Sequence, residues 1–357
     1  MCGIVAYVGN RRAYPVLIKG LQRLEYRGYD SAGVGLITED DNKIITYKQA
    51  GKVSDLLEFI ADQNTNGSIG IGHTRWATHG SPNKQNAHPH SSSDGKFSLI
   101  HNGIIENYSS LKKALEDKGY VFKSDTDSEV LMFLIEDVYK NALSSKELKV
   151  EEKTLFEAIR IALNEVVGAY AIVVLDQDKP EELYAARKGS PLVIGIGNGE
   201  YFVASDASPI IEYTDKVIYL EDNEVALINK NKDVQIKTIS NKTKSPYIQK
   251  LEQTLESIEK GGYDHFMLKE IYEQPKSIID TLRGRIDPKT NDIILGGIKD
   301  YESSIAKADR IIIIACGTSW HAGLIGEYLI EDLARINVEV EYASEFRYKN
   351  PIITKKD

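Results

Sequence analysis

The sequence of 357 residues carries 53 acidic and 44 basic side chains, for a formal net charge of −9, and 42% of its residues are hydrophobic. This is the composition of a soluble globular protein long enough for two domains, and its negative charge opposes binding to nucleic acid phosphates. No apolar run reaches the roughly 18–20 residues of a membrane span, and the N-terminus is apolar before it is basic, the reverse of a secretory signal. With only two cysteines, far apart in sequence, neither a disulfide framework nor a cysteine-rich zinc site is expected, and a cytoplasmic location fits.

Apolar runs and periodicities predict a first half rich in short strands. A buried strand is expected at 3–8, followed by a helix at 15–24 that opens on Pro15. The next elements are strands at 33–37, 43–48, 68–73 and 97–101, helices at 104–118, 127–140 and 154–165, and seven short strands between 169 and 238. Runs of strands separated by few helices favour antiparallel sheets that pack together and are covered by helices.

The second half has a different pattern. A polar, proline-containing stretch at 239–247 predicts a domain boundary, and residues 248–283 are expected to be mainly helical. A fully apolar strand then runs into a turn of small residues at 311–319. A helix at about 321–335 and a strand at 338–344 complete a βαβ unit, the start of a parallel sheet rather than a complete domain.

Cys2 is the first candidate for chemistry. A free cysteine is most often a small buried hydrophobe. Here, however, it follows Met1, and an initiator methionine is typically removed before a small residue. Removal leaves a thiol and a free α-amine on one residue, and an amine with a pKa of about 7.7–8.0 can accept the thiol proton near neutral pH. This is the means by which N-terminal nucleophiles are activated.

The segment HTRWATHG (73–80) concentrates polar chemistry directly after a predicted strand. Its Arg75 supplies a fork that matches a carboxylate. A single arginine or histidine is more often an ordinary surface group, but a loop this dense in recognition residues is unusual.

Two further segments carry candidate residues. HNGIIENY (101–108) contains an Asn-Gly pair, which is typical of turns, yet Asn102 and Gly103 also offer an amide donor and a close-approach backbone N–H, the components of an oxyanion hole. SDTDSEV (124–130) is typical of a helix N-terminus. An acid there also suits a substrate ammonium group, so both interpretations remain open.

Together these segments resemble the glutamine–fructose-6-phosphate aminotransferases (isomerizing), also called glucosamine-6-phosphate synthases. The matching strings span nearly all of residues 2–348, in the order CGIVAYVG, LQRLEYRGYDSAG, HTRWATHG, NAHPH, HNGIIENY, SDTDSEV, GAYA, RKGSPLVIGIG, FVASD, HFMLKEIYEQP, ACGTS and ASEFRY. CGI, HTRWATHG and HNG alone would indicate only class II glutamine amidotransferases. EYRGYDSAG, KEIYEQP and ACGTS narrow the resemblance to this family.

The resemblance implies an α+β fold, the four-layer αββα sandwich of the N-terminal-nucleophile (Ntn) hydrolases, followed by α/β sugar-isomerase (SIS) domains. It divides the chain into a class II glutamine amidotransferase (glutaminase) domain at 2–240, a linker and helical segment at 241–284, and an incomplete first SIS domain at 285–357. Full-length members continue for roughly another 250 residues, so the chain is expected to be truncated.

The resemblance also implies roles for individual residues. Cys2 is the nucleophile, its own amine is the base, and Asn102 and Gly103 form the oxyanion hole. Arg75 holds the α-carboxylate of glutamine and Asp127 its α-ammonium group. The residues implied to line the rest of the glutamine site are Trp76, Thr78 and His79, of which Trp76 also gates the passage of ammonia.

Other residues receive weaker assignments. Arg27 and Tyr29 lie in a family motif without a defined role, and His73, His88 and His90 are expected to be structural.

In the second half, Thr318 and Ser319 fall where a strand meets a helix N-terminus. Their hydroxyls and the local N–H groups suit a phosphate, and the family uses this turn for the sugar phosphate, although a plain helix cap has the same pattern. Cys316 is expected in a core, since no neighbours in sequence stabilise a thiolate.

The predicted function is that of an enzyme of amino-sugar biosynthesis, which hydrolyses L-glutamine to glutamate and ammonia through Cys2. In full-length members this ammonia converts fructose 6-phosphate to glucosamine 6-phosphate, whereas this chain is expected to carry out the glutaminase half-reaction only. No metal or organic cofactor is expected, because thiol, amine and backbone donors cover every step. The expected partners are L-glutamine and, at full length, fructose 6-phosphate and further copies of the chain; nucleic acid and membrane are not expected.

Two alternatives stay open. Another class II amidotransferase, such as the phosphoribosyl-pyrophosphate type, is opposed by ACGTS and KEIYEQP and by the lack of a phosphoribosyl-binding motif. A non-catalytic fragment that senses sugar phosphates is separated from a working glutaminase by measuring glutamate release.

Overall fold

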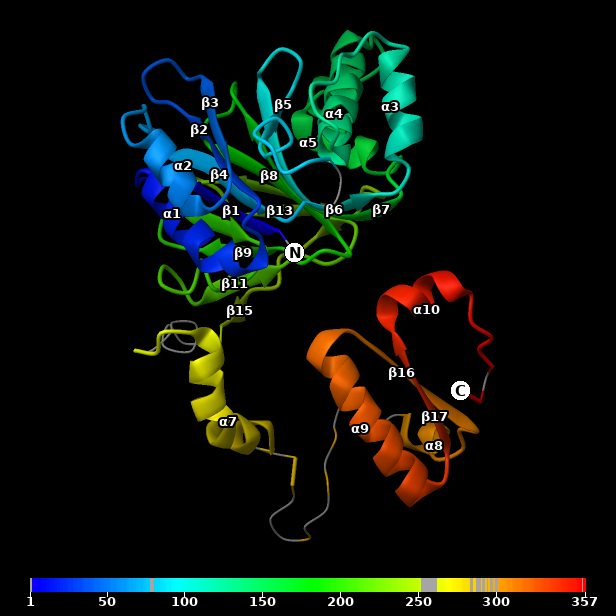
Figure 1. Cartoon of the computed structure of the whole chain (residues 1–357). Helices are drawn as coiled ribbons and strands as arrows, with labels where there is room; N and C mark the ends of the chain where they lie inside the picture. Colours follow the sequence, from blue (N-terminus) through cyan, green and yellow to red (C-terminus); the bar gives the residue numbers. More distant parts are fainter. Residues whose placement is uncertain are drawn as a thin grey trace. The chain divides into compact units, whose positions relative to one another are not determined.

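The computed structural model describes residues 2–77, 80–251, 262–282, 301–354 and 356–357, together with residues 285, 286, 290, 293, 295 and 298. Contacts divide the chain into two compact units, Met1–Gly261 and Gly262–Asp357 (Figure 1). The first unit contains two large antiparallel sheets, and the second contains a small parallel one.

The first large sheet has β1 near its centre, with β10 on one side and β4 on the other. From edge to edge its eight strands are β15 (Gln249–Lys250), β11 (Lys216–Tyr219), β9 (Val193–Ile196), β10 (Tyr201–Ala204), β1 (Gly3–Val8), β4 (Ile69–Arg75), β2 (Ser31–Ile37) and β3 (Ile44–Ala50). The second sheet has seven strands, β14 (Thr243–Lys244), β13 (Gln235–Thr238), β12 (Glu224–Asn229), β8 (Glu182–Lys188), β7 (Gly168–Asp176), β6 (Phe97–Ile105) and β5 (His90–Ser91).

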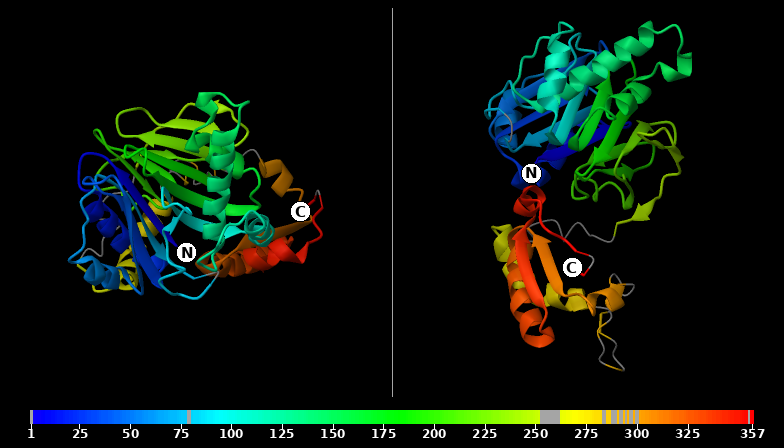
Figure 2. Two further views of the ribbon diagram at one scale, coloured as in Figure 1. Left: turned by 90° about the horizontal axis from the view of Figure 1, so that it is seen from above. Right: turned by 90° about the vertical axis from the view of Figure 1, so that its right-hand side faces the viewer.

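Helices cover the outer face of each sheet, which gives four layers (Figures 1 and 2). The helices on the first sheet are α1 (Ala13–Leu24) and α2 (Val53–Ile60), and those on the second are α3 (Tyr108–Glu116), α4 (Asp127–Ser144) and α5 (Leu155–Ala162). The described part of the unit also contains two short 3-10 helices, η1 (Glu25–Arg27) and η2 (Val150–Glu152). The predicted αββα arrangement is confirmed.

Strand β1 shows how the sequence builds these layers. Side chains alternate between the two faces of a strand, and both faces of β1 are covered. Ile4, Ala6 and Val8 pack between the two sheets, whereas Val5 and Tyr7 pack under the helices. A strand that is apolar at every position is therefore stabilised on both sides, by about 1.5–3 kcal/mol for each large side chain that is fully buried.

Two local predictions differ from the structure. Helix α2 was not predicted, because it has only eight residues, although Val53, Leu56 and Ile60 are buried at helical spacing. The helix expected from residue 104 begins at Tyr108, since β6 continues to Ile105 through its pairing with β7. This extension keeps the Asn-Gly pair within a strand.

The polar stretch after residue 240 still belongs to the sheets of the first unit. β14 pairs with β13, and β15 pairs with β11. The first unit accordingly runs to Gly261.

The second unit contains the predicted βαβ motif. Strands β16 (Arg310–Ala315) and β17 (Asn337–Tyr342) pair in parallel. Helix α9 (Gly317–Ala334) lies between them in the sequence. The other helices described are α7 (Phe266–Leu282), α8 (Glu302–Ile305) and α10 (Ala343–Lys349). Cys316 was expected in a core, but it is exposed, because the residues of β16 before it are themselves at most half-buried.

Candidate active site

Cys2 lies directly before β1, the strand near the centre of the first sheet. Its half-buried thiol accepts a hydrogen bond from the backbone N–H of Trp76, with 3.2 Å between nitrogen and Sγ. Burial raises the pKa of the Cys2 thiol, because a charged thiolate loses solvation. The thiol therefore needs a base to become a nucleophile. The α-amine predicted for that role appears once Met1 is removed, and Met1 lies outside the described residues.

The sheet register brings Arg75 beside Cys2. β1 and β4 are antiparallel, with Gly3 opposite Thr74, so Cys2, directly before β1, lies next to Arg75, the last residue of β4. The Arg75 side chain is 4% exposed and donates to the carbonyl oxygens of Gly80 and Ser81, both at 3.3 Å. Burial lowers the pKa of Arg75, and the charges of Cys2 and Asp127 raise it. These three groups thus lie within electrostatic reach of one another.

Asn102 and Gly103 approach from the second sheet, on β6. The Asn102 amide nitrogen donates to the backbone carbonyl oxygen of Cys2 at 3.0 Å. Gly103 has a φ of +136°, and a Cβ there would lie 2.0 Å from the carbonyl oxygen of Ala169. Only glycine fits this position, where the backbone lines the candidate site.

Asp127 is the first residue of α4. The cap of this helix is Thr126, whose hydroxyl accepts from the Glu129 N–H at 3.3 Å. The Asp127 carboxylate is 5% exposed and accepts from the backbone N–H of Ile105 at 2.8 Å. Capping is therefore supplied by Thr126, which leaves Asp127 to line the pocket.

One pocket joins most of these groups. The residues that line it are Cys2, Arg75, Trp76, His88, His101, Gly103, Thr126, Asp127 and Ser128. Asn102 lies behind them and contacts Cys2. Trp76 is 45% exposed and packs edge-on against Tyr29, with 5.4 Å between ring centroids. The other two predicted glutamine-site residues, Thr78 and His79, lie outside the described residues.

Behind the pocket, His73 contacts Asn102. The His73 Nε2 lies 3.0 Å from the backbone oxygen of His101 and 2.9 Å from the Asn102 Oδ1. A backbone oxygen can only accept, so Nε2 carries the proton, and the same N–H then requires Oδ1 of Asn102 to face it. The amide nitrogen is thereby turned toward Cys2. Sequence reasoning assigned His73 a structural role only and missed this contact.

His73 belongs to a cluster of buried histidines. The ring of His88 lies 4.0 Å from that of His73 and 4.7 Å from that of His90, between centroids. Burial lowers the pKa of His73 to about 3 and holds the pKa values of His88 and His90 well below the usual range. These three rings are therefore neutral near pH 7. The only signal in the sequence is their density, with five of seven histidines between residues 73 and 101.

The EYRGYDSAG segment packs against the backbone of Arg75 and Trp76, next to the Cys2 thiol. A Cβ on Gly28 would lie 2.8 Å from the carbonyl carbon of Arg75 and 2.9 Å from the nitrogen of Trp76. Asp30 accepts from the N–H of Ala77 at 2.8 Å and donates its own N–H to the Arg75 carbonyl at 3.0 Å. Gly28 and Asp30 thus hold the peptide that donates to Cys2.

The second unit contributes two predicted site residues. Thr318 and Ser319 are exposed in the first turn of α9, after β16. Within the described residues, no group of three or more histidine, cysteine, aspartate or glutamate side chains could hold a metal ion. None of the described helices combines the length and apolar character that crossing a bilayer requires.

Comparisons with known proteins divide the chain in the same order as its motifs. Residues 73–212 match a glutamine amidotransferase domain, and residues 304–357 match a SIS domain. A protein of Bacteroides thetaiotaomicron named glutamine–fructose-6-phosphate aminotransferase (isomerizing) is 58% identical over 358 residues, which cover 100% of this chain and 56% of that protein. A protein of the same name from Chlorobaculum tepidum is 52% identical, over 100% of this chain and 57% of the relative. The chain thus spans just over half the length of the curated relatives it matches.

Solved structures are similar in fold. The glutamine phosphoribosylpyrophosphate amidotransferase of B. subtilis matches with a TM-score of 0.56 and 23% identity, over 95% of this chain and 65% of that one. A structure described as the allosteric regulatory enzyme of purine biosynthesis matches with a TM-score of 0.55 and 27% identity, over 67% of this chain and 49% of that one. The fold is thus that of the Ntn-type glutamine amidotransferases, as predicted.

Proposed function

Since this chain belongs to the glutamine–fructose-6-phosphate aminotransferase family, we propose that its first unit hydrolyses L-glutamine to glutamate and ammonia, with Cys2 as the nucleophile. The observation that carries the proposal is the convergence of one thiol, one arginine and one carboxylate on a single pocket, formed by Cys2, Arg75 and Asp127. The phosphoribosyl-pyrophosphate type of amidotransferase has a similar fold, but 58% identity along the whole chain favours the aminotransferase family.

In the proposed reaction, the α-amine of Cys2, free after removal of Met1, accepts the thiol proton. The thiolate attacks the side-chain amide carbon of glutamine. The resulting oxyanion is stabilised by the amide of Asn102 and the N–H of Gly103. The C–N bond then breaks, ammonia leaves with a proton returned by the amine, and water cleaves the thioester to release glutamate and the thiol.

Two charged groups orient the substrate. Arg75 binds the α-carboxylate of glutamine through its planar fork, and Asp127 binds the α-ammonium group. The buried position of both side chains supports this assignment, since charge pairs are stronger where water is excluded. Trp76, Thr78 and His79 line the remainder of the glutamine site.

The activity of a complete family member is part of the same proposal. There the ammonia converts fructose 6-phosphate to glucosamine 6-phosphate, and Thr318 and Ser319 bind the sugar phosphate. We assign the glutaminase domain to 2–240, the linker and helical segment to 241–284, and SIS sequence to 285–357. Assembly of copies into a homo-oligomer and a cytoplasmic location, which fits two unpaired cysteines, complete the proposal.

The experiment that tests this function measures glutamate release from L-glutamine. Arg75→Lys is expected to raise the KM for glutamine by about tenfold or more, because a point charge cannot reproduce two parallel hydrogen bonds to a carboxylate. The matched control is Lys216→Arg, an exposed cation at the start of β11 and outside the pocket. No glutamate release from protein whose intact mass lacks Met1 would refute the proposal.

A further inference from the structure

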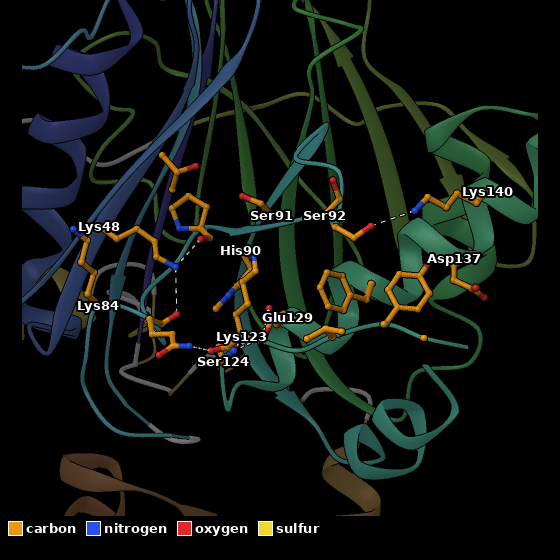
Figure 3. A pocket seen from close by; sticks show the side chains of 18 of the residues that line it. Lys48, Lys84, His90, Ser91, Ser92, Lys123, Ser124, Glu129, Asp137 and Lys140 are labelled. Atoms are coloured by element: carbon orange, nitrogen blue, oxygen red, sulfur yellow. Dashed lines mark hydrogen bonds between the residues drawn. The ribbon is translucent and has the colours of Figure 1, made fainter. Parts of the chain in front are cut away.

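The first unit contains a second cavity, of about 1100 Å³, that shares no lining residue with the candidate active site. Its walls are formed by β3 with the end of α2, by the segment at 84–93, and by the segment at 118–124 together with α4 (Figure 3). Small-molecule pockets usually measure about 300–1000 Å³. The cavity therefore has room for a whole metabolite.

Five lysines and two carboxylates line this cavity, and both carboxylates already have partners. Glu129 accepts from the N–H groups of Lys123 and Ser124, at 3.0 and 2.6 Å, and from the Ser124 hydroxyl at 2.7 Å. Asp137 pairs with Lys118 at 2.6 Å. Both carboxylates therefore already accept hydrogen bonds or form an ion pair within the wall of the cavity.

Lys140, beside Asp137 in Figure 3, pairs with Glu136 at 2.6 Å. Within the described part of the chain, three lining ammonium groups have no carboxylate within ion-pair distance. They are Lys48, Lys84 and Lys123.

Lys48 is the most enclosed of the three. Its Nζ donates to the carbonyl oxygens of Gln85 and Pro89, at 3.3 and 3.2 Å. Burial, together with the charges of Lys84 and Arg75, lowers the pKa of Lys48 to about 8, whereas the charge of Glu129 acts in the opposite direction. Lys84 lies with its Nζ 4.4 Å from the centre of the Phe59 ring. A partly desolvated ammonium group next to another cation is costly unless an anion compensates it.

Gln85 links the chain segments that carry the three lysines. It follows Lys84 in sequence, its backbone oxygen accepts from Lys48, and its side-chain amide donates to the backbone oxygen of Lys123. Figure 3 shows Lys48 and Lys84 on one side of the cavity and Lys123 next to Glu129. The lining also includes aromatic rings and hydroxyl groups, namely Tyr47, Phe59, Tyr120, Phe133, Ser91 and Ser92.

We propose that this cavity binds a phosphorylated metabolite, whose phosphate is held by Lys48, Lys84 and Lys123. Lysine binds phosphate as a point charge, and a dianion offsets the positive charges of these three lining lysines. The aromatic and hydroxyl-bearing wall accommodates the remainder of the molecule, which is either a sugar or a nucleoside. The inference does not depend on the proposed glutaminase function.

The test is isothermal titration calorimetry on the full chain, with inorganic pyrophosphate, glucose 6-phosphate and ADP as probes. At least one probe is expected to bind, and its Kd is expected to rise about tenfold in Lys84→Met and in Lys123→Met. Both side chains are exposed, so these variants keep the fold even if Lys48→Met does not. A preference for glucose 6-phosphate or for ADP identifies the ligand as a sugar phosphate or a nucleotide.

Two controls separate this site from other phosphate contacts. Lys96→Met removes a surface lysine that pairs with Asp178 outside the cavity and is expected to leave the Kd unchanged. Ser319→Ala alters the predicted phosphate turn of the second unit and separates any binding at that turn from binding in the cavity. The proposal is overturned if none of the probes binds, if binding survives Lys84→Met and Lys123→Met unchanged, or if Ser319→Ala removes it.

Discussion

Strands β1 and β16 carry the same signal in sequence but differ in burial. Both are short apolar runs, and both were predicted as strands. All six residues of β1 are buried, with a neighbouring strand on each side and a core on each face. The residues of β16 are at most half-buried, and Ile314 is 43% exposed.

This difference shows that an apolar run in the sequence predicts a strand, whereas the burial of that strand depends on the strands and helices that pack against it. β1 packs within two of the three clusters of the first unit. In the described part of the second unit, β16 has β17 as its strand partner, and α9 leaves apolar side chains such as Leu333 exposed. We therefore expect substitutions in the first unit to have large effects on activity and stability, and matched substitutions in the second to have small ones.

The two cysteines provide the strongest test of this contrast. Cys2→Ala is expected to lower glutamate release by at least about 10⁴-fold, because loss of a nucleophile removes the covalent pathway. Cys316→Ala is expected to leave the rate unchanged, since Cys316 is an exposed residue of the second unit. The measurement is the steady-state rate of glutamate production.

Circular dichroism of both cysteine variants provides the control for folding. Loss of activity in Cys316→Ala, or activity of Cys2→Ala within tenfold of the unsubstituted chain, would contradict the assignment of the chemistry to the first unit.

The oxyanion hole gives a smaller effect. Asn102→Ala removes the amide next to Cys2 and is expected to lower kcat by about 10²–10³-fold, the usual cost of one such donor. The KM for glutamine is expected to change little, because the donor acts on charge that develops in the transition state. Kinetics of Asn350→Ala, a change in the second unit, provide the matched control. A fall in kcat of less than tenfold for Asn102→Ala would assign the oxyanion to other donors.

Stability offers a third comparison, between two leucines on helices. Leu21 of α1 is fully buried, whereas Leu333 of α9 is 80% exposed. Leu21→Ala is expected to destabilise its unit by about 2–5 kcal/mol, and Leu333→Ala to change the stability of its unit by less than about 0.5 kcal/mol.

Each unit contains one of the two tryptophans, Trp76 and Trp320, so fluorescence can follow them separately. Urea unfolding in a Trp320→Phe background reports on the first unit, and unfolding in a Trp76→Phe background reports on the second. Equal losses for the two leucine substitutions would mean that α9 is buried in solution and that the contrast between the units is false.

Motifs allowed much of the candidate site to be predicted. Cys2, Arg75, Gly103 and Asp127 each stand in a segment whose residue types indicate their chemistry, and the structure brings all four to one pocket. The four-layer fold was implied by the family resemblance, and the runs of short strands separated by few helices agreed with it. The sequence alone did not show which residues from distant segments contact one another in the folded chain.

The contact between His73 and Asn102 joins β4 of the first sheet to β6 of the second. No spacing in the sequence encodes it, because it arises only when the two sheets pack face to face. The lysine-lined cavity was missed for the same reason, since Lys48, Lys84 and Lys123 come from three separate segments. Helix α2 was missed because eight residues hold too few turns for a clear periodicity.

The smallest predicted effect on activity concerns His73, which acts through another residue and is a positioning residue rather than a catalytic one. Its Nε2–H holds the Oδ1 of Asn102 at 2.9 Å, and without it the amide can turn its oxygen toward the oxyanion, where it repels charge. His73→Ala is therefore expected to lower kcat by about tenfold, which corresponds to about 1.4 kcal/mol, with little change in KM. His73→Gln restores an N–H donor and is expected to recover part of this loss.

Burial lowers the pKa of His73 to about 3, so the ring stays neutral above about pH 4 and both variants should keep the pH profile of the unsubstituted chain. A purely packing role would instead make both substitutions destabilising without a difference in kcat between alanine and glutamine, and a shifted pH profile would mean that His73 itself titrates during turnover.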